Sequence, residues 1–278
     1  MWSLYFYLYS SKDNDDREVQ KVLNRLTNNR SQSVDLYILI QYKNSVKLDI
    51  LTSHLIFTKE LQYDKPDKLL KQLLSYSSNS LRAIFFSGHC SLDYLQVTDN
   101  SIFHIGQLES ILLNFDPFDL IVFDCCSMAT LEVAYQLRNI SPYIIACQDY
   151  MGWIGFIGSN LIDIFKISSP ILVAQQLIKQ YLMVESYPTD AVLIDTQLIE
   201  ELVYSLQECE SISLAQQAHV ADNAYDIYLL ISQSNVSDEI KNWINQLLDN
   251  IVIYYQSNHT GWYGLSIKGE TLKMLIDS

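Results

Sequence analysis

The feature that most constrains the fold is a regular alternation of strand-like and helix-like segments over the first 158 residues. Short apolar runs typical of buried strands are separated by segments whose apolar residues recur at helical spacing. Such alternation predicts a mostly parallel sheet covered by helices on both faces. The predicted strands lie at 3–10, 34–42, 81–88, 120–124 and 142–147, with shorter β-like runs at 46–51 and 53–57, and the predicted helices at 17–26, 65–76, 105–113 and 127–138.

After Gly158 the pattern becomes mostly helical, and no linker rich in proline, glycine or serine separates the two parts. We therefore predict a single domain over 1–278, with a sheet core at 1–158 and a helical C-terminal part at 159–278. In this second part, helices are predicted at 160–166, 170–184, 199–207, 224–233 and 237–256, and strands at 190–195 and 262–268.

Composition limits the partners. The net charge of −14 disfavours nucleic acid and anionic membrane surfaces, and it suits a basic substrate. Glycine is scarce, with 8 residues, and no phosphate-binding glycine motif is present, which argues against a nucleotide-binding flavodoxin-like protein.

No apolar run is long enough to span a membrane, and the apolar opening segment has the pattern of a strand rather than a signal peptide. Five cysteines without regular spacing do not predict a disulfide framework, so we expect a reducing, cytoplasmic location.

Two neighbouring predicted strands end in reactive residues. His89 follows the strand at 81–88, and Cys126 follows the strand at 120–124, just before a helix predicted from Ser127. Reactive groups collect at the carboxyl edge of a parallel sheet, so these two side chains are expected to face each other. An imidazolium and a helix N-terminus each lower the pKa of a thiol, which favours the nucleophilic thiolate. The pattern predicts a Cys–His dyad.

The sequence "FFSGHC", followed by "DLIVFDCCSMATLEVAYQLRNISPYIIACQDYMGW", resembles the core of the clostripain-like cysteine peptidases. These belong to the clan of caspases, gingipains, legumain and separase. In that family one strand ends in His-Gly and the next in Phe-Asp-Ala-Cys-Leu-Met. Weaker similarities, "YLYSSKDND" and "WYGLSI", extend the resemblance over nearly the whole chain. The resemblance implies a caspase-like three-layer α/β sandwich and peptide hydrolysis through a thioester, with His89 and Cys126 as the catalytic pair.

The resemblance also implies cleavage after arginine or lysine, through an acidic S1 pocket. Asp124 matches one pocket acid, and Asp149, in the loop after the next strand, is the candidate for a second. A carboxylate at the base of a pocket pairs well with a guanidinium or ammonium group. Trp153 and Tyr150 are candidates for the pocket wall. The alternatives are that Asp124 caps the next helix and that the two aromatic side chains only pack the loop.

Two positions depart from the family pattern. Cys90 replaces the glycine whose backbone N–H, with that of Cys126, would form the oxyanion hole, and its Cβ restricts the backbone if a positive φ is needed. Cys125 replaces the alanine before the nucleophile and is interpreted as a small buried residue, like Cys147 and Cys209. The change at Cys90 leaves open an alternative function as a catalytically weak, caspase-like adaptor or partner-regulated signalling module.

Relatives in this family often mature by cutting the loop between their catalytic residues after lysine or arginine. This chain has no lysine or arginine from Ala83 to Leu137, so we predict no such internal cleavage. The protein is expected to be active at once or held inactive until a partner or ligand orders its loops. No cofactor is predicted. The acidic run at 13–16 is interpreted as a solvated turn, with calcium binding as the alternative.

Overall fold

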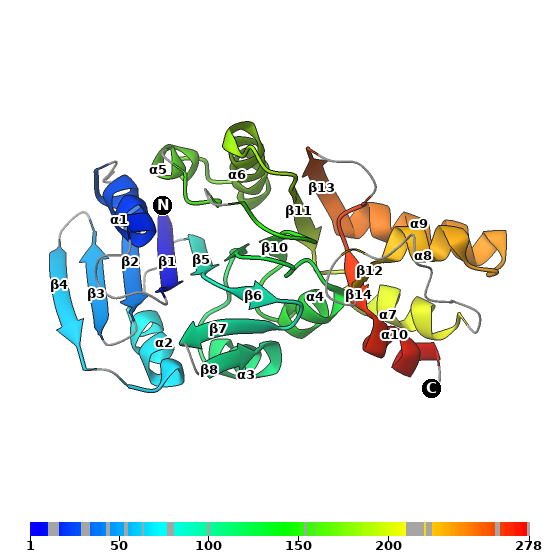
Figure 1. Ribbon diagram of the computed structural model, residues 1–278, viewed down its shortest axis with the longest axis horizontal. Helices are drawn as coiled ribbons and strands as arrows, with labels where there is room; N and C mark the ends of the chain where they lie inside the picture. The colour runs from blue at the N-terminus through cyan, green and yellow to red at the C-terminus, as the bar shows by residue number, and fades with distance from the viewer. Residues whose placement is uncertain are drawn as a thin grey trace.

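A nine-stranded sheet forms the centre of the protein (Figure 1). The computed structural model describes residues 1–10, 17–28, 34–42, 45–52, 55–62, 64–76, 81–98, 101–152, 155–158, 160–209, 220, 224–258 and 262–276. The strand order across the central sheet is β13-β11-β10-β9-β5-β1-β2-β3-β4. Its strands are β1 (Trp2–Tyr9), β2 (Val34–Gln41), β3 (Val46–Leu51), β4 (Ile56–Leu61), β5 (Leu81–Ser87), β9 (Leu120–Asp124), β10 (Tyr143–Ala146), β11 (Asp190–Asp195) and β13 (Val252–Ser257).

The central sheet is mostly parallel, as predicted. Strands β1, β2, β5, β9 and β10 pair in parallel with one another, and β3 and β11 run in the opposite direction to their neighbours. All eight residues of β1 are buried, which matches the near-continuous apolar runs expected of a sheet covered on both faces.

Helices cover both faces of this sheet, so the fold has three layers (Figure 1). Alternate side chains of β1 enter different cores: Tyr5 and Tyr7 lie in one, and Leu4 and Phe6 in the other. The first core takes apolar residues from α2 (Pro66–Leu74), α3 (Ile105–Leu112), α4 (Leu131–Leu137), α7 (Ile199–Gln207), α8 (Ile227–Gln233), α9 (Asp238–Ile251) and α10 (Gly269–Ile276). The second core takes them from α1 (Arg17–Asn28), α5 (Leu161–Ile164) and α6 (Pro170–Val184). Among the described residues no helix is long and apolar enough to cross a membrane.

The C-terminal part adds strands that the sequence pattern assigned to helices. The predicted helix at 237–256 ends at Ile251, and its last residues form β13 at the sheet edge. The run "VIYYQS" is rich in β-branched and aromatic residues, which favour a strand when an edge is open beside them. Likewise, the predicted helix at 224–233 begins as β12 (Ala224–Asp226), which pairs with β14 (Ser266–Lys268).

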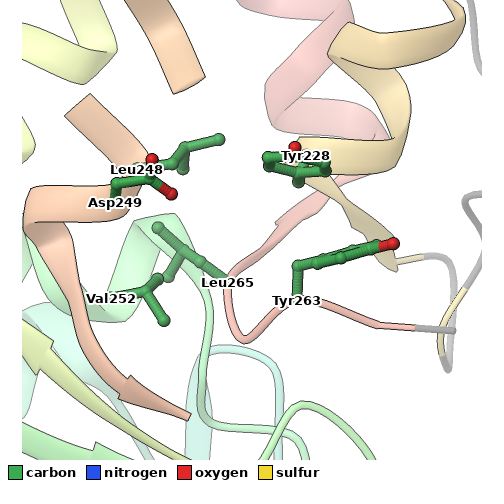
Figure 2. A pocket seen from close by; sticks show the side chains of 6 residues that line it. All are labelled: Tyr228, Leu248, Asp249, Val252, Tyr263 and Leu265. Atoms are coloured by element: carbon green, nitrogen blue, oxygen red, sulfur yellow. The ribbon is translucent and has the colours of Figure 1, made fainter. Parts of the chain in front are cut away.

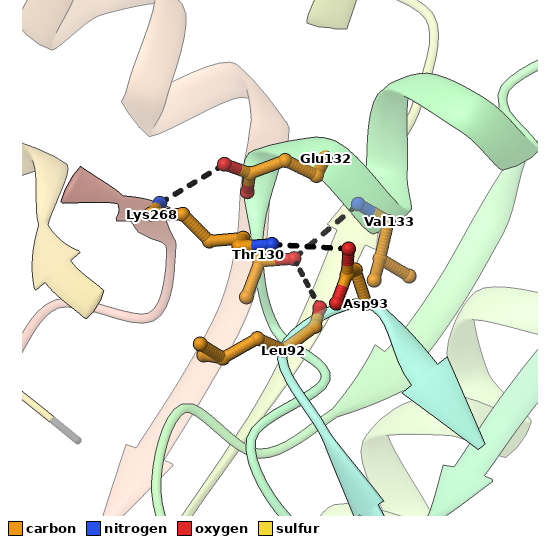
Figure 3. Close-up of polar contacts among 6 residues, drawn as sticks. All are labelled: Leu92, Asp93, Thr130, Glu132, Val133 and Lys268. Carbon is orange, nitrogen blue, oxygen red and sulfur yellow. Dashed lines mark hydrogen bonds and ion pairs between the residues drawn. The ribbon is translucent and has the colours of Figure 1, made fainter. Parts of the chain in front are cut away.

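A small three-stranded sheet between β5 and α3 was not predicted. It consists of β6 (Cys90–Ser91), β7 (Tyr94–Thr98) and β8 (Ser101–His104). Thr130 fixes this sheet to the next helix, because its hydroxyl donates to the Leu92 carbonyl (3.0 Å) and accepts from the backbone N–H of Val133 (Figure 3). The Lys268 ammonium also lies 3.0 Å from the Asp93 carboxylate. The chain between the two predicted catalytic residues is thus a folded unit over its described parts.

Candidate active site

His89 and Cys126 leave the sheet at the same edge. Strands β5 and β9 are parallel neighbours, and their last paired residues are Ser87 and Asp124. Each candidate catalytic residue lies two positions beyond its strand's last pair, so both are carried past the sheet edge by the same distance along the chain. His89 is exposed and Cys126 is partly exposed, so a substrate can reach both side chains. The predicted adjacency of the two strands is confirmed.

The backbone at this edge takes its unusual conformations next to the candidate residues. Gly88 has a φ of +149°, and a Cβ there would lie 3.4 Å from the backbone oxygen of Tyr9. Ser127, directly after Cys126, is left-handed with a φ of +55°. Cys90 is not among the described residues with positive φ, so its Cβ does not conflict with the backbone at the candidate oxyanion position.

The helix after Cys126 starts later than predicted. It begins at Leu131, with Thr130 as its N-cap, and not at Ser127. The residues in between form backbone hydrogen bonds with other segments instead. Leu92 N–H donates to the Ser127 carbonyl, and Ala129 N–H donates to the Cys147 carbonyl. The prediction that the helix N-terminus directly follows Cys126 is therefore wrong, as is the alternative that Asp124 caps this helix.

Cys90 and Cys125 form a disulfide bond, with their Cα atoms 5.5 Å apart. The expectation that the chain has no disulfide is therefore wrong. The two residues lie 35 positions apart, and only the turn of the chain into β6 brings Cys90 beside the end of β9. Cys126 is not disulfide-bonded. The cytoplasmic location remains a prediction, which the cysteine pattern no longer supports, because disulfides persist mainly in oxidising compartments.

Two segments after β10, here called the cover segments (149–152 and 155–158), contact the candidate residues. In the first segment, the Asp149 carbonyl accepts from Ser127 N–H (3.0 Å), and Met151 N–H donates to the Cys126 Sγ (3.3 Å). Gly152 N–H donates to the Tyr181 hydroxyl at 2.8 Å. The first cover segment is thus bonded directly to the candidate nucleophile and to helix α6.

Asp124 lies under the second cover segment. Its carboxylate Oδ1 accepts from Phe156 N–H at 2.5 Å, and only 9% of the residue is exposed. A Cβ at Gly155, whose φ is +63°, would overlap the same oxygen. Burial raises the pKa of Asp124 to about 6, although hydrogen bonds from Phe156 N–H and the Ser87 side chain lower it. A buried carboxylate of this kind is ready to pair with a cation that replaces its present donors.

The other predicted pocket residues are less well defined by their contacts. Asp149 is half-buried, and its backbone N–H donates to Asp190 Oδ1 at 3.4 Å. Tyr150 is 61% exposed, so it does not pack the loop interior. Trp153 lies outside the described residues, as does the acidic run at 13–16. The structure thus places the backbone of Asp149 beside Ser127, next to the candidate nucleophile, and the side chain of Asp124 under the second cover segment.

A buried polar network supports the first cover segment and was missed by the sequence analysis. Gln148, which is fully buried, donates its backbone N–H to the Asp190 carboxylate (3.1 and 3.2 Å) and its side-chain amide to Asp226 (2.9 Å) and Ser266 (2.8 Å). Burial raises the pKa of Asp190 to about 7. An aspartate opening the apolar strand "DAVLID" was the signal in the sequence, because a buried carboxylate needs donors that the strand itself does not supply.

The same network reaches a small cavity of about 170 Å³ near the C-terminal strands. Tyr228 and Tyr263 stack beside it (Figure 2), with ring centroids 4.5 Å apart. Tyr263 N–H donates to Asp226. A larger cavity of about 470 Å³ lies between α3, α4 and α7. Neither is lined by His89, Cys126 or Asp124. The two cavities therefore do not mark the candidate catalytic residues, which lie at the strand ends.

Comparisons with known proteins agree with this geometry. The model of the clostripain family matches residues 88–271. A secreted C11 cysteine protease from Bacteroides thetaiotaomicron, called iotapain, is 14% identical with a TM-score of 0.80, covering 98% of this chain and 95% of that one. An inactive zymogen C11 protease from Parabacteroides distasonis is 17% identical with a TM-score of 0.77, covering 99% and 94%. A secreted C11 protease from B. thetaiotaomicron, in complex with an irreversible peptide inhibitor, is 17% identical with a TM-score of 0.76, covering 96% and 92%. No curated protein matches the sequence.

Proposed function

The chain belongs to the clostripain family of cysteine peptidases, and from this premise we propose that it cleaves peptide bonds after arginine or lysine. In this proposal Cys126 is the nucleophile and His89 is its general base and acid. The observation that carries it is the β5–β9 register, which ends both strands together and places each of the two residues two positions beyond the last pair.

The chemistry follows from these two residues. His89 takes the proton of the Cys126 thiol, and the thiolate attacks the carbonyl carbon of the scissile bond. The backbone N–H groups of Cys90 and Cys126 stabilise the oxyanion that forms. When this intermediate collapses, the C–N bond breaks and His89 gives its proton to the leaving amine. Water, deprotonated by His89, then hydrolyses the thioester and restores the thiol.

For P1 specificity we propose Asp124 as the main counter-charge, assisted by Asp149. Its burial supports this role, because a carboxylate shielded from water pairs strongly with a guanidinium or ammonium group. The Phe156 N–H donates to the Asp124 carboxylate, so it has to move away before a P1 side chain can bind there. The proposal therefore includes displacement of the second cover segment when a basic side chain enters.

We also propose that no internal cut precedes activity. No lysine or arginine lies between Ala83 and Leu137, so an enzyme specific for basic P1 residues has no bond to cut there. The folding of residues 90–98 and 101–104 into a small sheet supports this further, because a folded hairpin does not enter an active site as an extended substrate. Activation then depends on a partner or ligand that moves the cover segments.

Two observations favour a second candidate function. Met151 N–H is bonded to the Cys126 sulfur, and Asp124 is covered, so the described arrangement would also suit a catalytically weak adaptor. The two functions differ in whether Cys126 reacts with a substrate-like electrophile.

The test is labelling by peptidyl chloromethyl ketones that carry arginine, lysine or aspartate at P1. We expect the two basic reagents to modify Cys126 at least tenfold faster than the aspartate reagent, with the site assigned by peptide mass spectrometry. Cys126→Ala and His89→Ala should abolish labelling and hydrolysis. Cys209→Ala removes a buried thiol remote from the strand ends and serves as the matched control. Equal rates with all three reagents would contradict the specificity, and no labelling by any would favour the adaptor.

A further inference from the structure

The disulfide joins the two residues that are covalent neighbours of the proposed catalytic pair. Cys90 directly follows His89, and Cys125 directly precedes Cys126. The bond therefore fixes the distance between the two backbones one residue away from each reacting side chain. A cross-link at this place acts on catalytic geometry more directly than one placed elsewhere in the fold.

Among the described residues, the strand pairing between these two segments stops before His89 and Cys126. The β5–β9 ladder ends at Ser87 and Asp124. Beyond it, the segment after β5 turns away and pairs Cys90 with Leu95, and the segment after β9 enters the turn at Ser127. The disulfide thus joins the two segments between the end of this ladder and the backbone hydrogen bond from Leu92 N–H to the Ser127 carbonyl, beside the proposed catalytic pair.

Both departures from the family pattern are explained by this one bond. The resemblance expects glycine at position 90 and alanine at position 125, and each is cysteine here. Either cysteine alone would add a thiol beside the nucleophile, whereas together they form a bond with both residues buried, 8% and 2% exposed.

We infer that the Cys90–Cys125 disulfide positions the catalytic pair. We also infer that it restricts peptidase activity to a range of intermediate redox potentials. This inference rests on the proposed function. Under strongly oxidising conditions the partly exposed Cys126 is blocked by small disulfides. Under strongly reducing conditions the buried disulfide opens, and the ends of β5 and β9 separate. Activity is highest between the two limits.

The redox step is ordinary thiol–disulfide exchange. A thiolate of a small dithiol such as dithiothreitol attacks one sulfur of the disulfide, breaks the S–S bond and forms a mixed disulfide. The second thiol of the reagent then closes its own ring, which leaves two protein thiols and the oxidised reagent. Two electrons and two protons pass from the dithiol to the protein. Oxidised dithiothreitol or another small disulfide reverses the reaction.

The experiment compares the wild type with Cys90→Gly/Cys125→Ala, which restores the residues that the resemblance expects, and with Cys209→Ala as the matched control. Hydrolysis of a P1-lysine peptide is measured across ratios of reduced to oxidised glutathione, continued at the reducing end with increasing dithiothreitol, and the disulfide content under each condition is read by alkylation and mass spectrometry. Wild type and Cys209→Ala should pass through a maximum and then lose at least fivefold in kcat, with KM within twofold, as the disulfide opens. For the double variant, kcat should rise to the value of the reduced wild type as the conditions become more reducing, and it should not fall again.

A second measurement keeps this inference separate from the proposed function. The rate of Cys126 alkylation by iodoacetamide needs no substrate, and we expect it to fall severalfold when the disulfide is reduced. If no peptide is cleaved but this rate still falls, the proposed function fails and the positioning role stands. If the alkylation rate and kcat do not change while mass spectrometry shows the disulfide opening, the positioning role is overturned. Absence of the Cys90–Cys125 bond in the oxidised protein overturns it as well.

Discussion

Replacing Asp124 with asparagine removes a buried carboxylate while keeping its size and its ability to accept a hydrogen bond. Burial raises the pKa of Asp124 from 3.8 to about 6. The native state therefore binds this proton more tightly than the unfolded chain does. The stability contributed by the protonated group is fully present below about pH 4 and is lost as the pH rises to about 6, by about 3 kcal/mol in total.

The Asp124→Asn variant should not show this loss of unfolding free energy with rising pH. Between pH 4.5 and pH 8 the wild type should lose about 2 kcal/mol of unfolding free energy through Asp124, since part of the loss has already occurred at pH 4.5. We therefore expect the stability difference, Asp124→Asn minus wild type, to increase by about 2 kcal/mol over that range. Urea unfolding at the two pH values measures it. Asp163→Asn makes the same chemical change on an exposed helix and is the matched control.

The Asp124→Asn substitution should lower peptidase activity although it raises stability. If Asp124 is the S1 counter-charge, its asparagine variant loses at least tenfold in kcat/KM for P1-arginine peptides while becoming more stable at pH 8. For the wild type, kcat/KM for these peptides should rise between pH 5 and pH 7, as Asp124 ionises. Parallel stability curves for the variant and the wild type from pH 4.5 to 8 would refute the buried-charge reasoning. Unchanged P1 preference would refute the pocket role alone.

Three further predictions concern the cover segments, the disulfide and the intact chain. Gly155→Ala should lower the unfolding free energy by about 1–3 kcal/mol, because a Cβ at this positive φ overlaps Asp124. Circular dichroism melts test this, and an unaffected variant contradicts it. Reduction of Cys90–Cys125, which closes a loop of 35 residues, should lower the unfolding free energy by up to about 4 kcal/mol in urea, with the double variant insensitive to reductant. Mass spectrometry of freshly active protein should show one uncut chain, and two fragments meeting within 90–125 would refute this.

The central sheet could be predicted because each of its parallel strands is a near-continuous apolar run with its own helix. The strands β5 and β9 are examples, and their adjacency followed from the single helix between them. The candidate dyad followed from the same reasoning, since strand ends at one edge meet in space. In these cases the local pattern and the final packing favour the same structure.

The errors arose where tertiary contacts decided between two local possibilities. The residues of β13 continue a helical pattern from α9, and they become a strand because β11 presents an unpaired edge. Residues 127–130 could have begun a helix, but their backbone groups bond to Leu92, Cys147 and Ser266 instead. The disulfide depends on the turn into β6, and no pattern within either cysteine's own segment indicates its partner.

The contacts of the cover segments bear on how activity is controlled. Three backbone N–H groups, from Met151, Gly152 and Phe156, are bonded to Cys126, Tyr181 and Asp124. Each such bond contributes about 0.5–1.5 kcal/mol net, so displacing all three costs about 2–4 kcal/mol. A basic P1 side chain offsets part of this cost, because it replaces an amide with a full charge on Asp124. A partner that favours the displaced form by the full 2–4 kcal/mol would raise the open population by about 30- to 1000-fold. We therefore propose that partner binding, rather than chain cleavage, is the activating step.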